Sequence, residues 1–284
     1  MLLPCGLSAY SFTVNNWTAN PGTTQGTDVT PGTSDAEGAW TEVLAAASVT
    51  KHCYWMHLAF SGGRVAGQIE NQLVDVGVDP AGGTAYSAII SNFQVGSAPN
   101  TTDGGKREHV FPFFIPSGSS VAVRMQGSNA VAEPTRAIIA LWGQPSRPEN
   151  VPVGMFSETL GTLSGSKGQS FTPGNAADGT YADFGTTTQN LWWWQVGVGV
   201  DNATMAQEKT FVDVAWGDAT NKHVLFRTTM QLHTTEHVGF YVPTYLAVCA
   251  AYQPVPAGSH IYVRGRCDSA PDTGYHATVI GIGG

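Results

Sequence analysis

Hydrophobic residues along this chain fall in short runs of strand length, separated by clusters of Gly, Pro, Asn and Asp. In residues 52–60 and 191–200, aromatic and large aliphatic residues follow one another with too few polar positions for the polar face of a helix. Short runs of this kind, bounded by turn residues about 8–12 residues apart or more, indicate a β-sandwich or barrel. The other runs predicted as strands are 73–78, 86–93, 120–125 and 137–142 in the first half, and 211–216, 224–232, 260–265 and 277–282 in the second.

One segment departs from the strand pattern. Residues 35–47 begin with two acidic residues and place Trp40, Val43 and Leu44 at helical spacing. Acidic residues in the first turn and an apolar stripe predict a short amphipathic helix. The corresponding residues 178–185 are fewer and lack the pattern.

The two halves of the chain repeat one another in the same order. The matches keep offsets of 142, then 138, then 140 residues, so only loop lengths change between them. A period of this length is too long for a solenoid unit, and each copy is expected to be a whole small domain. The fold predicted is therefore all-β, with two tandem jelly-roll-like β-sandwich domains related by internal duplication. The clearest matches are Thr30-Pro31-Gly32 with Thr172-Pro173-Gly174, Trp55 with Trp193, Val74-Asp75-Val76 with Val212-Asp213-Val214, and Val123-Arg124 with Val263-Arg264.

Punctuation by Pro, Gly and Asn sets the expected boundaries. Residues 1–28 are rich in Asn, Thr and Gly and are expected to be an extended N-terminal arm that lies across neighbouring subunits, with Phe12 and Trp17 as anchoring interface residues. The first β-sandwich repeat is placed at 29–143. Residues 144–170 are interpreted as a Pro/Gly/Ser-rich linker and lead-in, and the second repeat as 171–284.

Composition narrows the class of protein. Only 12% of the 284 residues are charged, against about a quarter in an average soluble domain. Because interface cores are depleted in Lys, Glu and Asp, this composition favours a protein packed against neighbours, although an ordinary Thr/Gly-rich β protein shows it too. The net charge of −8 without a basic cluster argues against nucleic-acid binding. No run approaches the ~18 apolar residues of a membrane span, and the first residues lack the pattern of a secretory signal, so cytosolic synthesis without Sec export is expected.

Two acidic and two basic residues recur at equivalent places. Asp75 and Asp213 sit between valines, and Arg124 and Arg264 follow the same Pro-x-Gly-Ser bend. We interpret them as one structural ion pair in each domain, Asp75 with Arg124 and Asp213 with Arg264. A glycosidase-like pair of carboxyl groups is the catalytic alternative, but it needs two acids about 5–10 Å apart in one cleft. Acids in separate domains meet that condition only if the domains face each other.

Metal and cofactor chemistry has weak support. His233 and His237 lie four residues apart, which in a strand is about 13 Å, too far for one zinc ion. None of the four cysteines forms a C-x-x-C pair, and no P-loop, G-x-S-x-G or G-x-G-x-x-G motif follows a strand. No metal, no cofactor and no catalytic residue are predicted.

The run Trp192-Trp193-Trp194 is the most prominent aromatic feature. Strand alternation sends Trp193 to one face and its neighbours to the other. Because Trp193 matches Trp55, it is assigned to the core, and Trp192 and Trp194 are predicted to face outward as interface residues. Sugar stacking and simple edge packing are the two alternatives.

Two segments, residues 74–84 and 111–124, resemble virion structural proteins of tailed bacteriophages. They read Val-Asp-Val-Gly-Val-Asp-Pro-Ala-Gly-Gly-Thr and Phe-Pro-Phe-Phe-Ile-Pro-Ser-Gly-Ser-Ser-Val-Ala-Val-Arg, and the resemblance is clearer in the first repeat than in the second. It implies a β-sandwich protein of the virion that lies on the capsid or the tail.

The function expected is that of a non-enzymatic virion protein, foremost a capsid decoration or cement protein. Its expected partners are other virion proteins, such as major capsid or tail proteins, and copies of itself in a homo-oligomer, with neither nucleic acid nor membrane. The alternative is a tail or fibre protein that binds a host-surface glycan.

Overall fold

The computed structural model describes residues 11–14, 26–32, 34–62, 70–98, 107–128, 135–143, 153–200, 208–232, 254–268 and 274–284. In these ranges the chain forms eighteen strands and one 3-10 turn, η1 (Ala46–Ser48). The predicted all-β sandwich class is confirmed. The strands build four sheets, in which the described strands pair antiparallel apart from the two-residue strand β12 on β17. The described residues include no helix with the length and hydrophobicity needed to cross a bilayer.

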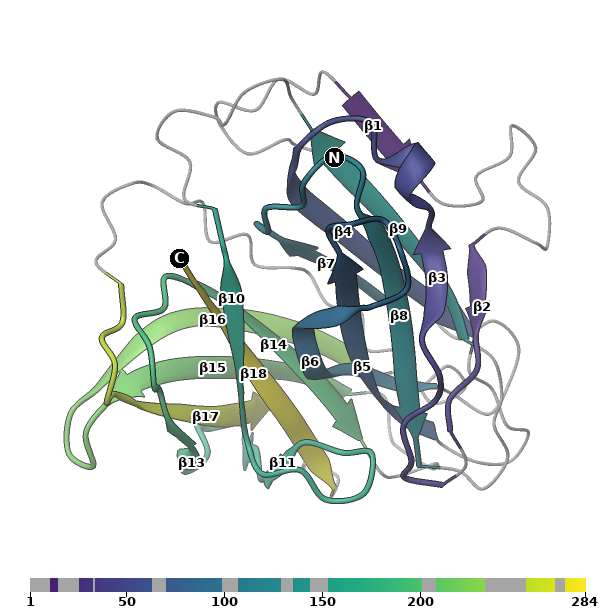
Figure 1. Cartoon of the computed structure of the whole chain (residues 1–284). Helices are drawn as coiled ribbons and strands as arrows, with labels where there is room; N and C mark the ends of the chain where they lie inside the picture. Colours follow the sequence, from purple (N-terminus) through teal and green to yellow (C-terminus); the bar gives the residue numbers. More distant parts are fainter. Residues whose placement is uncertain are drawn as a thin grey trace.

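The first sandwich consists of two sheets, which we name 1a and 1b (Figure 1). In sheet 1a the order is β1-β9-β4-β7, with β2 also paired to β9. In sheet 1b the order is β3-β8-β5-β6. The strands are β1 (Ser11–Val14), β2 (Thr27–Val29), β3 (Thr41–Leu44), β4 (Cys53–Gly62), β5 (Glu70–Asp79), β6 (Ser87–Ala98), β7 (Arg107–Phe111), β8 (Ser120–Gly127) and β9 (Thr135–Gly143).

The second sandwich is built in the same way from sheets 2a and 2b. In sheet 2a, β10, β11 and β14 all pair with β18. In sheet 2b the order is β12-β17-β15-β16, with β13 also paired to β17. The strands are β10 (Phe156–Leu160), β11 (Gln169–Phe171), β12 (Gly174–Asn175), β13 (Ala182–Thr186), β14 (Trp193–Val200), β15 (Glu208–Gly217), β16 (Lys222–Leu232), β17 (His260–Cys267) and β18 (Tyr275–Gly283).

The strand order of the first sandwich is that of a jelly roll, in which eight strands fold as two Greek keys. The described strands of the second sandwich pair in the same order, with β18 between β10 and β14 and β17 between β13 and β15. The described strands of the two sandwiches therefore share one topology. The internal duplication stays a prediction from the sequence.

Both sandwiches begin with an edge strand that is interrupted. In the first, β1 pairs with Ala140–Gly143 of β9, and β2 continues along the same edge at residues 135–137. In the second, β10 and β11 divide the edge of β18 in the same way. The described part of the predicted linker and lead-in, residues 153–170, contains β10, which pairs with β18 and opens the second sandwich. Likewise the predicted arm contributes β1 to the sandwich of its own chain.

The predicted helix over 35–47 is wrong. The segment instead contains β3, which pairs with β8, followed by the single turn η1. Val43 and Leu44 are buried in the first core, and the edge of β8 supplies the backbone partners that a helix would have supplied internally. The equivalent β13 is also a strand.

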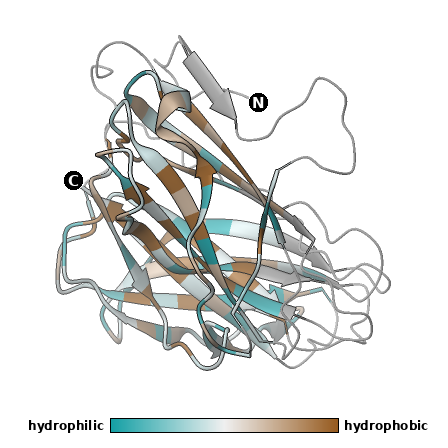
Figure 2. Cartoon of the chain, turned by 45° about the vertical axis from the view of Figure 1, so that its right-hand side comes forward, coloured by the Kyte–Doolittle hydropathy of each residue, from teal (hydrophilic) through white to brown (hydrophobic). Residues whose placement is uncertain are grey.

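Each sandwich holds its hydrophobic core between its two sheets, as strand alternation requires. Figure 2 shows hydrophobic and hydrophilic residues alternating along the strands. Val74, Val76 and Val78 of β5 point into the first core, and Val212 and Val214 of β15 point into the second. The residues between them, including Asp75 and Asp213, lie on the outer faces of sheets 1b and 2b.

The two sandwiches are packed against each other. Sheet 2a lies against strand β6, the edge strand of sheet 1b, and Ile280 and Ile282 of β18 belong to the first hydrophobic core. Side chains of sheet 2a bind backbone groups of β6, with Ser157 donating to the carbonyl of Ile89 at 2.6 Å. The second sandwich thus covers an edge that would otherwise expose unpaired backbone groups.

Candidate functional site

The first polar cluster lies on the outer face of sheet 1b. Asp75 of β5 is directly opposite Arg124 of β8, and the Asp75 Oδ2 atom accepts hydrogen bonds from Arg124 Nε at 2.8 Å and Nη2 at 2.6 Å. The other carboxylate oxygen accepts the backbone N–H of Asn92 at 2.6 Å. Asn92 has a left-handed backbone (φ 52°) at an irregularity between β5 and β6, which turns its N–H toward the acid.

An aromatic pair covers this cluster. The Arg124 guanidinium lies 4.6 Å from the centre of the Trp40 ring and also pairs with Glu37 at 2.6 Å. Trp40 packs beside Tyr86, with ring centroids 5.8 Å apart. Both aromatic residues lie over Gly77, where a Cβ atom would be 2.8 Å from the Trp40 ring. The glycine of Val-Gly-Val therefore makes room for the tryptophan.

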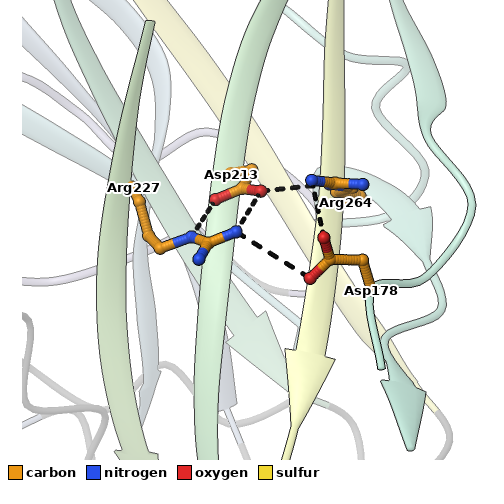
Figure 3. A network of polar contacts seen from close by, with 4 residues as sticks. All are labelled: Asp178, Asp213, Arg227 and Arg264. Carbon is orange, nitrogen blue, oxygen red and sulfur yellow. Dashed lines mark hydrogen bonds and ion pairs between the residues drawn. The ribbon is translucent and has the colours of Figure 1, made fainter. Parts of the chain in front are cut away.

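The second cluster occupies the equivalent place on the outer face of sheet 2b (Figure 3). Asp213 of β15 lies directly opposite Arg264 of β17 on one side and Arg227 of β16 on the other. Its Oδ2 atom accepts hydrogen bonds from Arg264 Nε at 3.0 Å and from Arg227 Nη2 at 2.8 Å. Asp178 closes the network, 2.7 Å from Arg264 Nη2 and 3.8 Å from Arg227 Nη2. Arg264 also lies 4.5 Å from the centre of the Tyr181 ring.

The arginines keep Asp213 ionised. Burial alone raises the pKa of this carboxyl group, but the hydrogen bonds from Arg227 and Arg264 outweigh it, and the pKa lies below its ordinary value. The same contacts raise the pKa of Arg227. A carboxylate in this state can orient arginines but is a poor proton donor near neutral pH.

The structure brings together both predicted pairs, Asp75 with Arg124 and Asp213 with Arg264. Sequence reasoning missed Glu37, Asp178, Asn92 and Arg227. Glu37 and Asp178 lie at matching places before β3 and β13 and could have been found from the repeat, since both precede an aromatic residue by three positions. Arg227 and Asn92 could not, because they differ in type between the repeats and depend on the register of β16 and β6.

The prediction for Trp194 is wrong. Alternation does place Trp193 and Trp194 on opposite faces of β14, but neither face meets solvent. Trp194 is 3% exposed and lies in the core of the second sandwich. Trp193 belongs to the first core cluster, where its ring meets Trp55 edge to face with centroids 5.3 Å apart. Trp192 is partly buried against the same cluster. The run is an internal seam between the sandwiches, which excludes Trp194 as a docking or sugar-stacking residue.

The remaining predicted residues are placed only in part. Phe12 lies in β1, opposite Trp142 of β9. Trp17, His233 and His237 lie outside the described residues. Within the described ranges, no group of three or more His, Cys, Asp or Glu side chains is arranged to hold a metal ion.

A buried polar cluster joins the two sandwiches. The Gln94 backbone N–H donates to Thr278 Oγ1 at 2.8 Å, and Gln94 Oε1 accepts the Gly168 N–H at 2.7 Å. His276 Nδ1 lies 3.2 Å from the same oxygen. Gln94 and His276 are fully or almost fully buried. Because buried polar groups are costly to leave unpaired, these contacts fix how the two sandwiches meet.

Comparison with known proteins adds little to this picture. No family model and no curated protein matches the sequence. Among solved structures, PNGF-II is similar at 8% identity and a TM-score of 0.37, covering 96% of this chain, which spans 65% of that chain. The tandem CBM22-1–CBM22-2 domains of Paenibacillus barcinonensis Xyn10C are similar at 12% identity and a TM-score of 0.30, covering 96% and 90% of the two chains. Broad bean stain virus gives 9% identity and a TM-score of 0.30, covering 93% and 92%. At these values the likenesses carry no argument about activity or partners.

Proposed function

We propose that this chain is a non-enzymatic structural protein of a virion, most directly a capsid decoration or cement protein of a tailed phage. It would stabilise the particle through contacts with major capsid proteins and with copies of itself. Support comes from the resemblance carried by residues 74–84 and 111–124, and from the jelly-roll architecture, which is common in capsid and lectin domains. Because one fold serves many functions, the polar sites have to carry the argument.

The state of the buried acids is the observation that carries the proposal. Asp75 and Asp213 are almost fully buried, and both are bound by arginine side chains that come from neighbouring strands. A catalytic acid needs a raised pKa, whereas the pKa of Asp213 is lowered. In both sandwiches the most concentrated charge therefore holds strands together, which supports a structural role.

The contact between the sandwiches also supports a structural role. Sheet 2a caps the β6 edge with side-chain hydrogen bonds, and Gln94 ties β6 to β18 and to Gly168. Two jelly rolls fixed in one orientation present a stiff surface to neighbouring subunits. Rigidity of this kind lowers the entropy cost of docking.

The test is the composition and stability of the particle. Gel densitometry of purified virions should show this chain in many copies, comparable to the capsid protein. Particles assembled without it should release their genome at a lower temperature, and added purified protein should restore the midpoint. A chain that is absent from the particle, or particles whose stability is unchanged without it, would reject the proposal.

One observation favours the alternative, a tail or fibre protein that binds a glycan. Trp40 and Tyr86 form a partly exposed aromatic pair on sheet 1b, and Tyr86 donates a hydrogen bond to Glu42 at 3.3 Å. Aromatic surface beside carboxylates can stack on sugars and bind hydroxyl groups. A few copies per virion, with glycan binding lost in Tyr86→Ala, would support the alternative over the decoration role.

A further inference from the structure

We infer that copies of this chain associate head to tail, with the outer face of sheet 2b of one copy against the outer face of sheet 1b of the next. The inference deepens the proposed structural role and rests on it. The two faces occupy equivalent places in the two sandwiches, and among the described residues they carry opposite charge.

The outer face of sheet 1b is acidic. This face carries three acidic residues, Glu37, Glu42 and Asp75, and one basic residue, Arg124. Both glutamates are exposed. The paired Asp75 and Arg124 cancel, so the two exposed glutamates set the sign of the face. Ala88, exposed on β6 opposite Gly77, adds no charge.

The outer face of sheet 2b is basic, although the whole chain has a net charge of −8. Its acids are Asp178, Asp183, Asp213 and the exposed Asp268, which lies opposite Lys209, and five basic residues outnumber these four. These basic residues are Lys209, Lys222, Arg227, Arg264 and Arg266. The hairpin turns do not change the contrast, because Asp79 and Asp218 occupy the matching turns β5–β6 and β15–β16.

Aromatic side chains lie among the charges on both faces. Sheet 1b presents Trp40 and Tyr86, and sheet 2b presents Phe211, flanked by Lys209 at 5.3 Å and Arg227 at 6.0 Å from the ring centre. Aromatic and arginine residues are enriched at protein interfaces. The charges would set the partner and its orientation, and the rings would supply contact area.

The arrangement favours unlike faces over like faces. Two 1b faces would bring four exposed glutamates together, and two 2b faces would oppose their arginines. Pairing 2b with 1b uses a different patch on each copy, so the contact propagates into a ring or a filament. Among the described residues, the contact between the sandwiches uses β6 and sheet 2a, and it leaves Glu37 and Glu42 on face 1b and Lys209 and Arg266 on face 2b exposed.

Paired charge-reversal variants test the inference. The first variant, Lys209→Glu with Arg266→Glu, makes face 2b acidic. The second, Glu42→Lys with Ala88→Lys, makes face 1b more basic. All four side chains are exposed. A control, Lys51→Glu with Arg136→Glu, makes the same change in net charge as the first variant but lies on β9 and just before β4, away from both faces. Circular dichroism and thermal unfolding establish that each variant is folded.

Sedimentation velocity supplies the readout. The wild type and the control should associate with rising concentration at about 0.05 M salt and dissociate near 1 M, where the Debye length is about 3 Å. Each variant alone should stay monomeric, and an equimolar mixture of the two should associate again, because the acidic 2b face then meets the basic 1b face. A monomeric wild type at low salt, or variants that associate like the wild type, would overturn the inference. If virions still contain the chain in that case, the proposed function stands and only this contact is wrong.

Discussion

The carbonyl oxygen of Gln94, in the first sandwich, lies directly against Gly197 of the second, in the position where any other residue would place its Cβ atom. Gly199 is enclosed in the same way by the side chains of Gln94, His276 and Asn71. Two glycines on the outer face of β14 thus allow β6 to approach closely. In the first sandwich, the residue of β4 that corresponds to Gly197 is Ala59.

Gly197→Ala should therefore disturb the contact between the sandwiches. Overpacking typically costs about 1–3 kcal/mol, and we expect a loss of about 2 kcal/mol or more in the free energy of unfolding, measured by urea denaturation. Ala59→Gly is the matched control and should cost less than about 1 kcal/mol. A Gly197→Ala protein with the wild-type midpoint would show that β6 and β14 are not held this closely.

Asp213→Asn should destabilise the protein by about 2 kcal/mol, because Arg227 and Arg264 lose the carboxylate that both bind. The equivalent replacement Asp75→Asn removes the partner of one arginine and should cost less. Thermal and chemical unfolding of the two variants measure the difference. Equal losses would argue that Arg227 contributes nothing to the network.

The pH dependence of stability should identify Asp213 as a source of acid sensitivity. Its folded pKa lies below the unfolded value of about 3.9, so its contribution is complete above that value and is lost as pH falls through the folded pKa. The stability gap between wild type and Asp213→Asn should be constant from about pH 7 to 5 and shrink below about pH 4. A gap that stays constant to the lowest pH at which both fold would contradict the lowered pKa.

A double-mutant cycle on Asp75 and Arg124 tests the first cluster. Alanine at either position breaks the same pair, so the combined loss should be smaller than the sum of the single losses by about 1 kcal/mol. Chemical denaturation of the four proteins provides the four free energies. Additive losses would mean that the 2.6 Å contact contributes no stability of its own.

Cys53 should be inert in the folded protein. Burial raises the pKa of its thiol to about 11, and only the thiolate reacts. Native protein treated with iodoacetamide at about pH 8 should leave Cys53 unmodified by peptide mass spectrometry, while denatured protein should be modified at this position. Equal labelling in the two states would show that this end of β4 opens readily.

The sequence was sufficient for the features that depend on local pattern. Alternation and turn residues predict the sandwich class. The repeat also predicts the pairs Asp75 with Arg124 and Asp213 with Arg264, and the structure places the two members of each pair opposite each other on neighbouring strands of one sheet.

The predictions that were wrong, and the strand that was missed, depend on contacts between segments that are distant in the sequence. Residues 35–47 have the spacing of a helix, yet β8 offers an edge that converts Thr41–Leu44 to a strand. Strand alternation predicts that Trp194 faces solvent, because a strand of a single sandwich has one outer face. In the structure the other sandwich lies against that face of β14, so both faces are buried. The Pro- and Gly-rich composition of 144–170 hid β10, whose pairing with β18 is set by residues more than a hundred positions away.

Electron cryomicroscopy of the intact particle tests the central claim most directly. The account predicts many copies of two abutting jelly rolls on the outer surface, joined by β6 and sheet 2a and bound to capsid subunits. Purified virions whose density and protein content lack this chain, or a chain whose two sandwiches lie apart, would contradict it.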